Sequence, residues 1–380
     1  MPAPRRPLHL RPTRRLMVTL AVLGLFAGAA ACSSDEGGDG GDEASQAASA
    51  ATTEAGPTTT TTPAVAASEG CGATSAAAPG TTDETIVVDG NEGRYQLIVP
   101  EGYDGTTPLP LVFGLHALTV SYTFVPAGAG FADMAEDYDF IGVSPSNLVD
   151  NGTFFWMAAP VEDNPDVVFM EALLDELEAE LCIDTTKVFS TGQSNGAQMS
   201  SVLACQVSDR ITAVAPIAGV EFPAEEGVCD DRPVPVMAFH GTADPIVTYE
   251  GGGLNAATIA NMHYWKGDVP DDVPEHEGVD QAMDNWAAHN GCEPGRQEER
   301  VSDEVVLATW EGCEAETVLY VVEGGGHTWP GRPTPGFEEQ FGPTTMDIEA
   351  TPLMFEFFLG PPGEQSEPGD AGAGSTTTTP

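Results

Sequence analysis

The sequence predicts an α/β fold with a mostly parallel central sheet and helices on both faces. Strand-like runs alternate with helix-like segments along residues 71–360. The middle runs are almost continuously apolar, which is typical of parallel strands covered on both faces. Two early runs are joined by the turn DGNEG at residues 89–93, which predicts an antiparallel edge. Strands that alternate with helices build a parallel sheet from βαβ units.

The individual elements follow from local patterns. Strands are expected at residues 85–90, 94–100, 110–116, 140–146, 187–192, 211–219, 234–241 and 316–325. Helices are expected at residues 165–182, 195–205, 279–290 and 345–358. In the first helix, Phe169, Leu173 and Leu177 share one face with acidic residues opposite, and Asp166 after Pro165 is a start signal. Ligands of such sheets bind at the carboxyl ends of the strands.

Both ends of the chain read as segments outside the domain. Residues 1–31 combine an arginine-rich start with an apolar run and predict a signal peptide. The small residues before Cys32 resemble a bacterial lipoprotein cleavage site with Cys32 as the lipidated residue, although Ala29 leaves ordinary signal cleavage open. Residues 32–70 read as a disordered tether and residues 361–380 as a disordered tail. The expected location is extracellular or on the cell surface, as a bacterial lipoprotein.

The charge excludes several classes of partner. The chain has 59 Asp and Glu against 13 Lys and Arg, a formal net charge of −46. Such a surface repels nucleic acid and anionic membranes, so membrane contact is expected only through an N-terminal lipid anchor. Solubility is the simplest reason for the acidic surface.

One serine stands where an α/β sheet places a nucleophile. Ser194 lies between Gly192 and Gly196, after an apolar strand and before a helix. The glycines allow strand and helix to approach closely, and this strand–turn–helix context is that of a nucleophile elbow. An ordinary glycine-rich turn is the alternative.

A serine nucleophile needs a base and an acid that orients the base. Asp244 and His327 each follow an apolar strand, and the order Ser194, Asp244, His327 is the one this arrangement requires. His240 precedes the aspartate and fits that order badly, and Glu323 is the fallback acid. The oxyanion hole should use the N–H of Asn195 and an N–H of Ala117 or Leu118. No metal or cofactor is required.

The six cysteines after Cys32 predict disulfides rather than a metal site. Cys292 ends a helix and Cys313 ends a strand-like run, with a short loop between them, so this pair is expected to close. Cys205 and Cys229 should meet at the end of the sheet opposite the active site, which leaves Cys71–Cys182. Four cysteines allow three connectivities, so these last two pairs are less strongly determined.

Six segments together resemble the extracellular polyhydroxybutyrate depolymerase and feruloyl esterase-like branch of the α/β-hydrolases. They are GRYQLIVPEGYDG, PLPLVFGLHAL, CIDTTKVFSTGQSNGAQMSSVLAC, RPVPVMAFHGTADPIVTYEGG, NGC and EGGGHTWPG. The resemblance covers nearly the whole domain and maps the nucleophile, acid and base onto Ser194, Asp244 and His327. It implies an α/β-hydrolase fold and a secreted or surface-anchored serine carboxylic-ester hydrolase with an acyl-enzyme mechanism.

The resemblance leaves the substrate more open than the chemistry. It implies a polyester, an oligoester or an acylated polysaccharide, with a polyhydroxybutyrate depolymerase first and a feruloyl or acetyl-xylan esterase as the alternative. A serine peptidase and a non-catalytic surface-binding lipoprotein are further alternatives. Trp329, Trp156 and His116 are the candidate substrate contacts, and the loop from His116 onward departs from the family's small-residue loop. The insertion at 251–276 either overhangs the cleft or is a surface loop.

Overall fold

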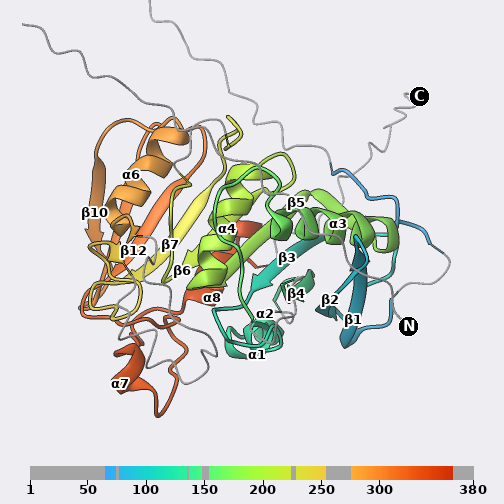
Figure 1. The fold of residues 1–380 in the computed structure, drawn as a ribbon, viewed down its shortest axis with the longest axis horizontal. Helices are drawn as coiled ribbons and strands as arrows, with labels where there is room; N and C mark the ends of the chain where they lie inside the picture. Colours follow the sequence, from blue (N-terminus) through green and yellow to red (C-terminus); the bar gives the residue numbers. More distant parts are fainter. Residues whose placement is uncertain are drawn as a thin grey trace, which may run out of the picture. The chain divides into compact units, whose positions relative to one another are not determined.

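A ten-stranded mixed sheet forms the centre of the protein (Figure 1). The computed structural model describes residues 65–73, 77–134, 137–147, 154–223, 228–253 and 275–362, all within the compact unit Thr61–Pro380. The strand order is β1-β2-β4-β3-β5-β6-β7-β12-β11-β10, and β8 and β9 form a separate two-stranded sheet. The strands are β1 (Gly80–Val88), β2 (Asn91–Val99), β3 (Leu109–Leu115), β4 (Ile141–Pro145), β5 (Ile183–Gln193), β6 (Ala213–Ile217), β7 (Val236–Gly241), β8 (Gly252–Gly253), β9 (Glu275–His276), β10 (Arg296–Arg300), β11 (Val305–Trp310) and β12 (Thr317–Val322).

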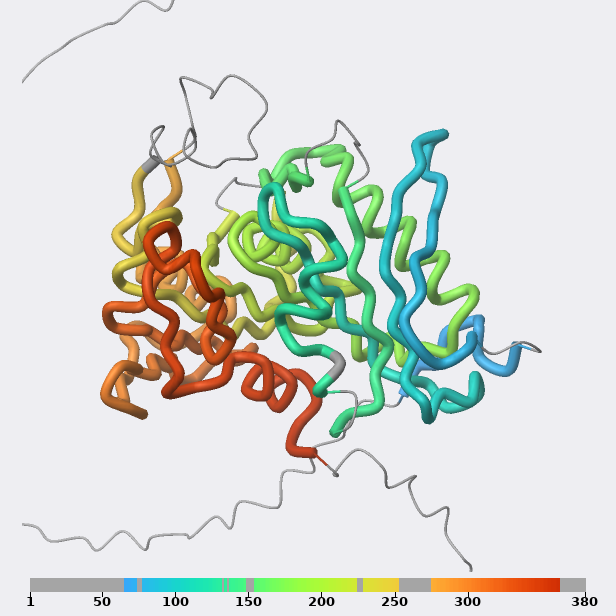
Figure 2. The backbone as a smooth tube through the Cα atoms, turned by 90° about the horizontal axis from the view of Figure 1, so that it is seen from below, coloured from blue at the N-terminus to red at the C-terminus, as the bar shows by residue number. Residues whose placement is uncertain are grey.

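The central strands are parallel, as the sequence predicts. β4, β3, β5, β6, β7 and β12 pair in parallel, and β1 and β2 add the expected antiparallel edge. The opposite edge is antiparallel as well, because β11 pairs with β12 and with β10 in that direction. Figure 2 shows the β1–β2 hairpin in blue and the orange strands on opposite sides of the molecule. β10 has the sequence RQEER and is mostly exposed, so it carries no apolar alternation that predicts a strand.

Helices cover both faces of the sheet, which confirms the predicted α/β-hydrolase architecture. They are α1 (Phe124–Gly128), α2 (Phe131–Met134), α3 (Pro165–Glu180), α4 (Asn195–Gln206), α6 (Val279–His289), α7 (Glu338–Phe341) and α8 (Ala350–Leu359). Alternate residues of β3 serve the two faces. Phe113 packs in the core that contains α3, α4 and α6, and Val112 packs in the core that contains α1, α2 and α8.

α3 begins at Pro165, as the sequence predicts, whereas α8 begins later than expected. Asn164, rather than Asp166, caps α3: its side chain accepts hydrogen bonds from the backbone N–H groups of Asp166 and Val167. Asp166 is buried and instead accepts a hydrogen bond from the backbone N–H of Met157 at 2.6 Å. α8 begins at Ala350, five residues later than expected, and residues 345–349 before it are not helical.

The domain starts earlier than the sequence indicates. Residues 65–70, assigned to the tether, are part of the fold: Ala67 forms a β-bridge with Asp184, and Ser68 accepts a hydrogen bond from the N–H of Ile183 at 2.8 Å. This short segment is poor in large apolar residues, and backbone hydrogen bonds hold it, so composition misplaces the boundary. Of the terminal predictions, residues 1–64 and 363–380 lie outside the described residues.

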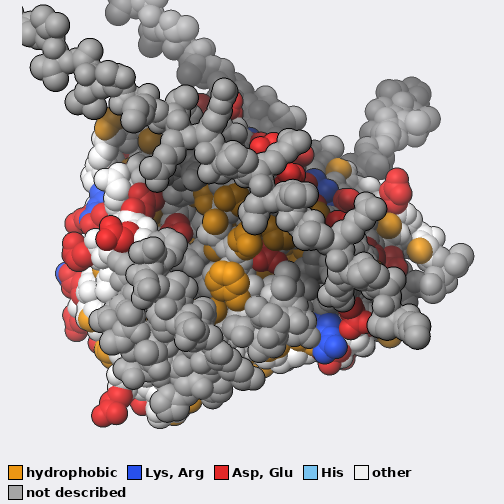
Figure 3. Space-filling view, in the orientation of Figure 1, with side chains coloured by type: hydrophobic (Ala, Val, Ile, Leu, Met, Phe, Trp, Pro, Cys, Tyr) orange, Lys and Arg blue, Asp and Glu red, His pale blue; other side chains and the backbone are white. Residues whose placement is uncertain are grey.

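Three disulfides hold the domain in the pairing expected from the sequence. They are Cys71–Cys182, Cys205–Cys229 and Cys292–Cys313. Such bridges are typical of proteins that function outside the reducing cytosol. No helix within the described ranges is both long and apolar enough to span a bilayer. Figure 3 shows acidic side chains spread over one face, with few basic ones among them.

Candidate active site

Ser194 occupies a sharp turn between β5 and α4. Its backbone has φ 57° and ψ −122°, a conformation that costs a non-glycine residue energy. The Ser194 N–H donates to the carbonyl of Ile217 on the neighbouring strand β6 at 2.9 Å, which holds the turn in place. The side chain therefore stands at the carboxyl end of a central strand and the N-terminus of a helix, as predicted.

The glycines around Ser194 are required by close backbone contacts. A Cβ on Gly192 would lie 2.6 Å from the backbone of Gly196, and a Cβ on Gly196 would lie 2.3 Å from the carbonyl oxygen of Leu115. A Cβ on Gly219 would lie 2.5 Å from the carbonyl oxygen of Ser194. Backbone atoms cannot rotate away as side chains do, so only glycine fits at these three positions.

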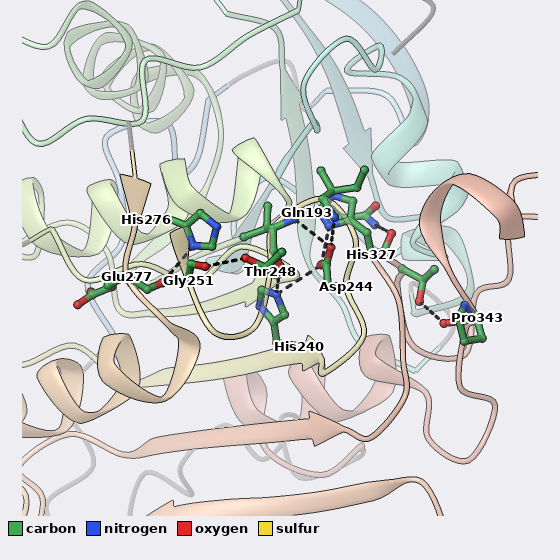
Figure 4. Close-up of polar contacts among 12 residues, drawn as sticks. Gln193, His240, Asp244, Thr248, Gly251, His276, Glu277, His327 and Pro343 are labelled. Atoms are coloured by element: carbon green, nitrogen blue, oxygen red, sulfur yellow. Dashed lines mark hydrogen bonds and ion pairs between the residues drawn. The ribbon is translucent and has the colours of Figure 1, made fainter. Parts of the chain in front are cut away.

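Asp244 lies in the loop after β7 and is buried. Its Oδ1 accepts hydrogen bonds from the backbone N–H groups of Ile246 (2.8 Å) and Val247 (2.9 Å). Its Oδ2 lies 2.7 Å from Nδ1 of His327 and 3.4 Å from Nε2 of His240 (Figure 4). Burial alone would raise the pKa of Asp244, but the two histidines hold that pKa well below its usual range.

His327 lies in the loop after β12, where two backbone contacts fix it. Its N–H donates to the carbonyl of Phe341 at 2.6 Å, and its own carbonyl accepts from the side-chain amide of Gln193 at 3.3 Å. Gln193 directly precedes Ser194, so the loops that carry Ser194 and His327 touch. Asp244 holds Nδ1 of the imidazole, which leaves Nε2 as the nitrogen that can accept a proton.

The loop after β3 packs on the N-terminus of α4. A Cβ on Gly196 would lie 2.6 Å from the carbonyl oxygen of His116, so this loop runs directly over the turn. Ala117 and Leu118 follow in that loop, and Asn195 is the first residue of α4. The first N–H groups of a helix have no partner within the helix and carry a partial positive charge, which stabilises a developing oxyanion.

The buried Trp156 forms hydrogen bonds both to the N-terminus of α4 and to the loop after β3. Its backbone N–H donates to Oδ1 of Asn195 at 2.7 Å, its carbonyl accepts from Nδ2 of Asn195 at 3.0 Å, and its indole N–H donates to the carbonyl of His116 at 3.1 Å. The His116 ring stacks on the indole with centroids 4.8 Å apart. Sequence reasoning missed this role of the Asn195 side chain.

His116 and Trp156, which the sequence analysis names as candidate substrate contacts, are buried in this structure. Both side chains are 0 % exposed. Burial lowers the pKa of His116 to about 4, against the opposing effect of its hydrogen bond to the carbonyl of Ala117. The pair supports the loop after β3 instead of lining a cleft.

Gln193, the residue before Ser194, lines a pocket of about 340 Å³, and so does the third substrate candidate, Trp329. The indole N–H of Trp329 donates to Thr351 at 3.0 Å, so the ring is also part of the core. The pocket wall is mostly apolar. Gln193 contributes a side-chain amide and Arg332 a cationic side chain. The lining residues are Ala117, Val120, Phe124, Val125, Gly128, Ala129, Gln193, Trp329, Arg332, Pro333, Thr334 and Pro335.

The remaining sequence-based candidates lie elsewhere. Glu323, the fallback acid, is exposed and pairs with Arg300 at 2.8 Å. Most of the insertion at 251–276 and the lipidation candidate Cys32 lie outside the described residues. Within the described part of the chain, no set of three or more His, Cys, Asp or Glu is arranged to hold a metal ion.

Comparison with known proteins finds feruloyl esterases among the relatives of this chain. No family model matches the chain. The sequence is 29% identical to feruloyl esterase D of Neurospora crassa over 290 residues, covering 74% of this chain and 88% of that protein. It is 28% identical to feruloyl esterase C of Emericella nidulans over 268 residues, covering 68% and 83%.

The fold and the similarity define the class: the chain is a serine carboxylic-ester hydrolase of the α/β-hydrolase fold. Within that class, the predicted resemblance to the feruloyl esterase-like branch is confirmed.

Proposed function

We propose that Ser194, His327 and Asp244 form the catalytic triad of this esterase. Ser194 attacks the ester carbonyl while Nε2 of His327 takes the hydroxyl proton, and Asp244 stabilises the imidazolium. The oxyanion lies between the N–H of Asn195 and an N–H of Ala117 or Leu118. His327 then protonates the leaving alcohol, and water repeats the sequence to release the acid. The 2.7 Å contact between His327 and Asp244 is the observation that carries this proposal.

We propose that the acyl group is aromatic, as in a feruloyl ester of plant polysaccharide. The relatives named feruloyl esterases support this choice over a hydroxyalkanoate polyester. The pocket supports it as well, since its walls are mostly apolar and include Trp329 and Phe124. Two lining residues add support, since Gln193 directly precedes the proposed nucleophile and Ala117 is a proposed oxyanion donor.

A comparison of esters tests the substrate class. The full-length protein is assayed in parallel against methyl ferulate, hydroxybutyrate oligomers, short acetyl esters and p-nitroanilides. The proposal expects the highest kcat/KM for methyl ferulate and no amide cleavage. Faster hydrolysis of hydroxybutyrate oligomers would restore the polyester reading.

A paired substitution links that preference to the pocket. Phe124 is 48 % exposed and lines the pocket, whereas Val87 is 69 % exposed on the edge strand β1. Phe124→Ala should raise KM for methyl ferulate by about tenfold while leaving acetyl esters unchanged. Val87→Ala is the matched surface control and should change neither.

We further propose that the protein is exported and anchored through lipid on Cys32. The small residues before Cys32 and the three disulfides support export. The mature chain should begin at Cys32 and partition into detergent, and Cys32→Ser should move it to the aqueous phase. A wild-type chain that starts elsewhere and stays aqueous would remove the anchor and leave the enzymatic proposal intact.

A further inference from the structure

A second histidine contacts the proposed catalytic acid from the side opposite His327. His240 lies near the end of β7 and is 1 % exposed. Its Nε2 lies 2.8 Å from the carbonyl oxygen of Val247 and 3.4 Å from Oδ2 of Asp244. Figure 4 shows Asp244 between the two imidazole rings.

These contacts determine which nitrogen of His240 carries a proton. A carbonyl oxygen and a carboxylate oxygen are both acceptors, so Nε2 faces them as an N–H donor shared between the two. Nδ1 of His240 is buried and has no hydrogen-bond partner among the described residues. An apolar side chain would fill this site without leaving a buried nitrogen unpaired, so packing alone gives no reason for a histidine here.

The Nε2–H of His240 completes the hydrogen bonds around Asp244. Two backbone N–H groups hold Oδ1, and Oδ2 has a donor on each side, His327 and His240. With only His327 at Oδ2, the carboxylate would rotate more freely and the 2.7 Å bond to the imidazole would lose its fixed direction. A change in that direction displaces Nε2 of His327, the nitrogen that faces the reaction.

We propose that His240 is a positioning residue that orients Asp244, so that the acid of this site is held by two histidines. The inference rests on the proposed triad, because it assigns His240 a role only through Asp244. His240 is buried, and its Nε2 contacts Val247 and Asp244, so it acts on the reaction only through the acid. His327 is the proposed base that exchanges the proton. His240 precedes Asp244 in the chain, an order that argues against a role as the base but is compatible with a role in orienting the acid.

Three variants test the role of the N–H. His240→Leu removes the donor and keeps an apolar side chain of similar size, whereas His240→Gln retains an amide N–H near the place of Nε2. The proposal expects His240→Leu to lower kcat on the order of 10- to 100-fold with KM nearly unchanged, and His240→Gln to recover a large part of that loss. His289→Leu is the matched control, because Nε2 of His289 also contacts a backbone carbonyl (3.1 Å, on Arg232), and it should leave kcat unchanged.

A double-mutant cycle separates positioning from a general structural effect. In an Asp244→Ala background, His240→Leu should cause no further loss of kcat, because its only route to the reaction is gone. Equal fold-losses in both backgrounds would overturn the proposal, as would wild-type kcat in His240→Leu. Circular dichroism shows that each variant is folded before its kcat is compared with that of the wild type.

The same data distinguish this inference from the proposed function. If Ser194→Ala retains turnover, the triad itself fails. If Ser194→Ala and Asp244→Ala lose most of their turnover but His240→Leu is not impaired, only the positioning role fails.

Discussion

His327 and Asp244 lie 83 positions apart in the sequence, yet Nδ1 of His327 lies 2.7 Å from Oδ2 of Asp244 in a buried pair. The contact forms because β7 and β12 are parallel neighbours, in register from Val236–Thr317 to Gly241–Val322. Loops that follow the same edge of two adjacent parallel strands meet. The sheet order thus brings together two side chains that the chain keeps far apart.

The first prediction concerns that pair. Asp244→Asn keeps the shape of the side chain, but its amide can donate to Nδ1 and stabilise the wrong tautomer of His327. We expect kcat to fall by roughly 10⁴-fold, the size of loss known for this change in a serine triad. Steady-state hydrolysis of methyl ferulate measures it, with circular dichroism as the control for folding. A loss of less than tenfold would show that another group orients the histidine.

The second prediction concerns Gly196, where a Cβ would meet backbone oxygens of Leu115 and His116. Gly196→Ala must push the loop after β3 away from the N-terminus of α4, so both kcat and the melting temperature should fall. Gly102→Ala is the matched control, since its added Cβ would meet only the side chain of Asp139 at 3.2 Å. Equal effects of the two substitutions would contradict the close approach at the turn.

The third prediction uses the pH dependence of stability. Burial raises the pKa of Glu221 to about 7, Glu277 adds to that effect, and a hydrogen bond from Gln198 opposes it. A raised folded-state pKa means that the folded protein binds a proton that the unfolded chain has released. The contribution of Glu221 to stability is therefore full below about pH 4.5 and is lost as the pH rises through about 7.

Glu221→Gln cannot ionise, so it should be more stable than the wild type at pH 8, by about 3 kcal/mol, and similar to it at pH 4.5. Urea unfolding at the two pH values measures the difference. Equal stabilisation at both would mean that ionisation of Glu221 is not the cause.

The fourth prediction concerns the Cys292–Cys313 bridge, which closes a loop with a sequence separation of 21. Replacing both cysteines by serine should lower the free energy of unfolding by about 3 kcal/mol, mainly because the unfolded chain gains freedom. The bridge is not part of the triad, so kcat at 25 °C should stay near the wild-type value. Urea unfolding and ester hydrolysis on the same sample check both statements.

Sequence reasoning reached the parts of this protein that local patterns determine. The apolar runs predict the strands of the fold. The glycines around Ser194 and the order Ser194, Asp244, His327 predict the candidate triad. It failed where contacts between residues far apart in the sequence determine the structure. His116 and Trp156 pack on each other across 40 positions, and β10 is a strand only because β11 pairs with it.

The role of His240 shows the same limit. Chain order excludes it as the base, but chain order says nothing about which side chains flank the acid. A histidine four residues before the aspartate, at the end of the same strand, was the available signal. Only the 3.4 Å contact between the two gives it meaning.

The most direct test of the account is the turnover of Ser194→Ala beside that of His327→Ala, with methyl ferulate as substrate and matched folding by circular dichroism. The account predicts that each variant loses at least roughly 10⁴-fold in kcat, and that combining them costs little more, because the two groups act as a unit. Near-normal turnover by Ser194→Ala would contradict the central claim that this serine is the nucleophile.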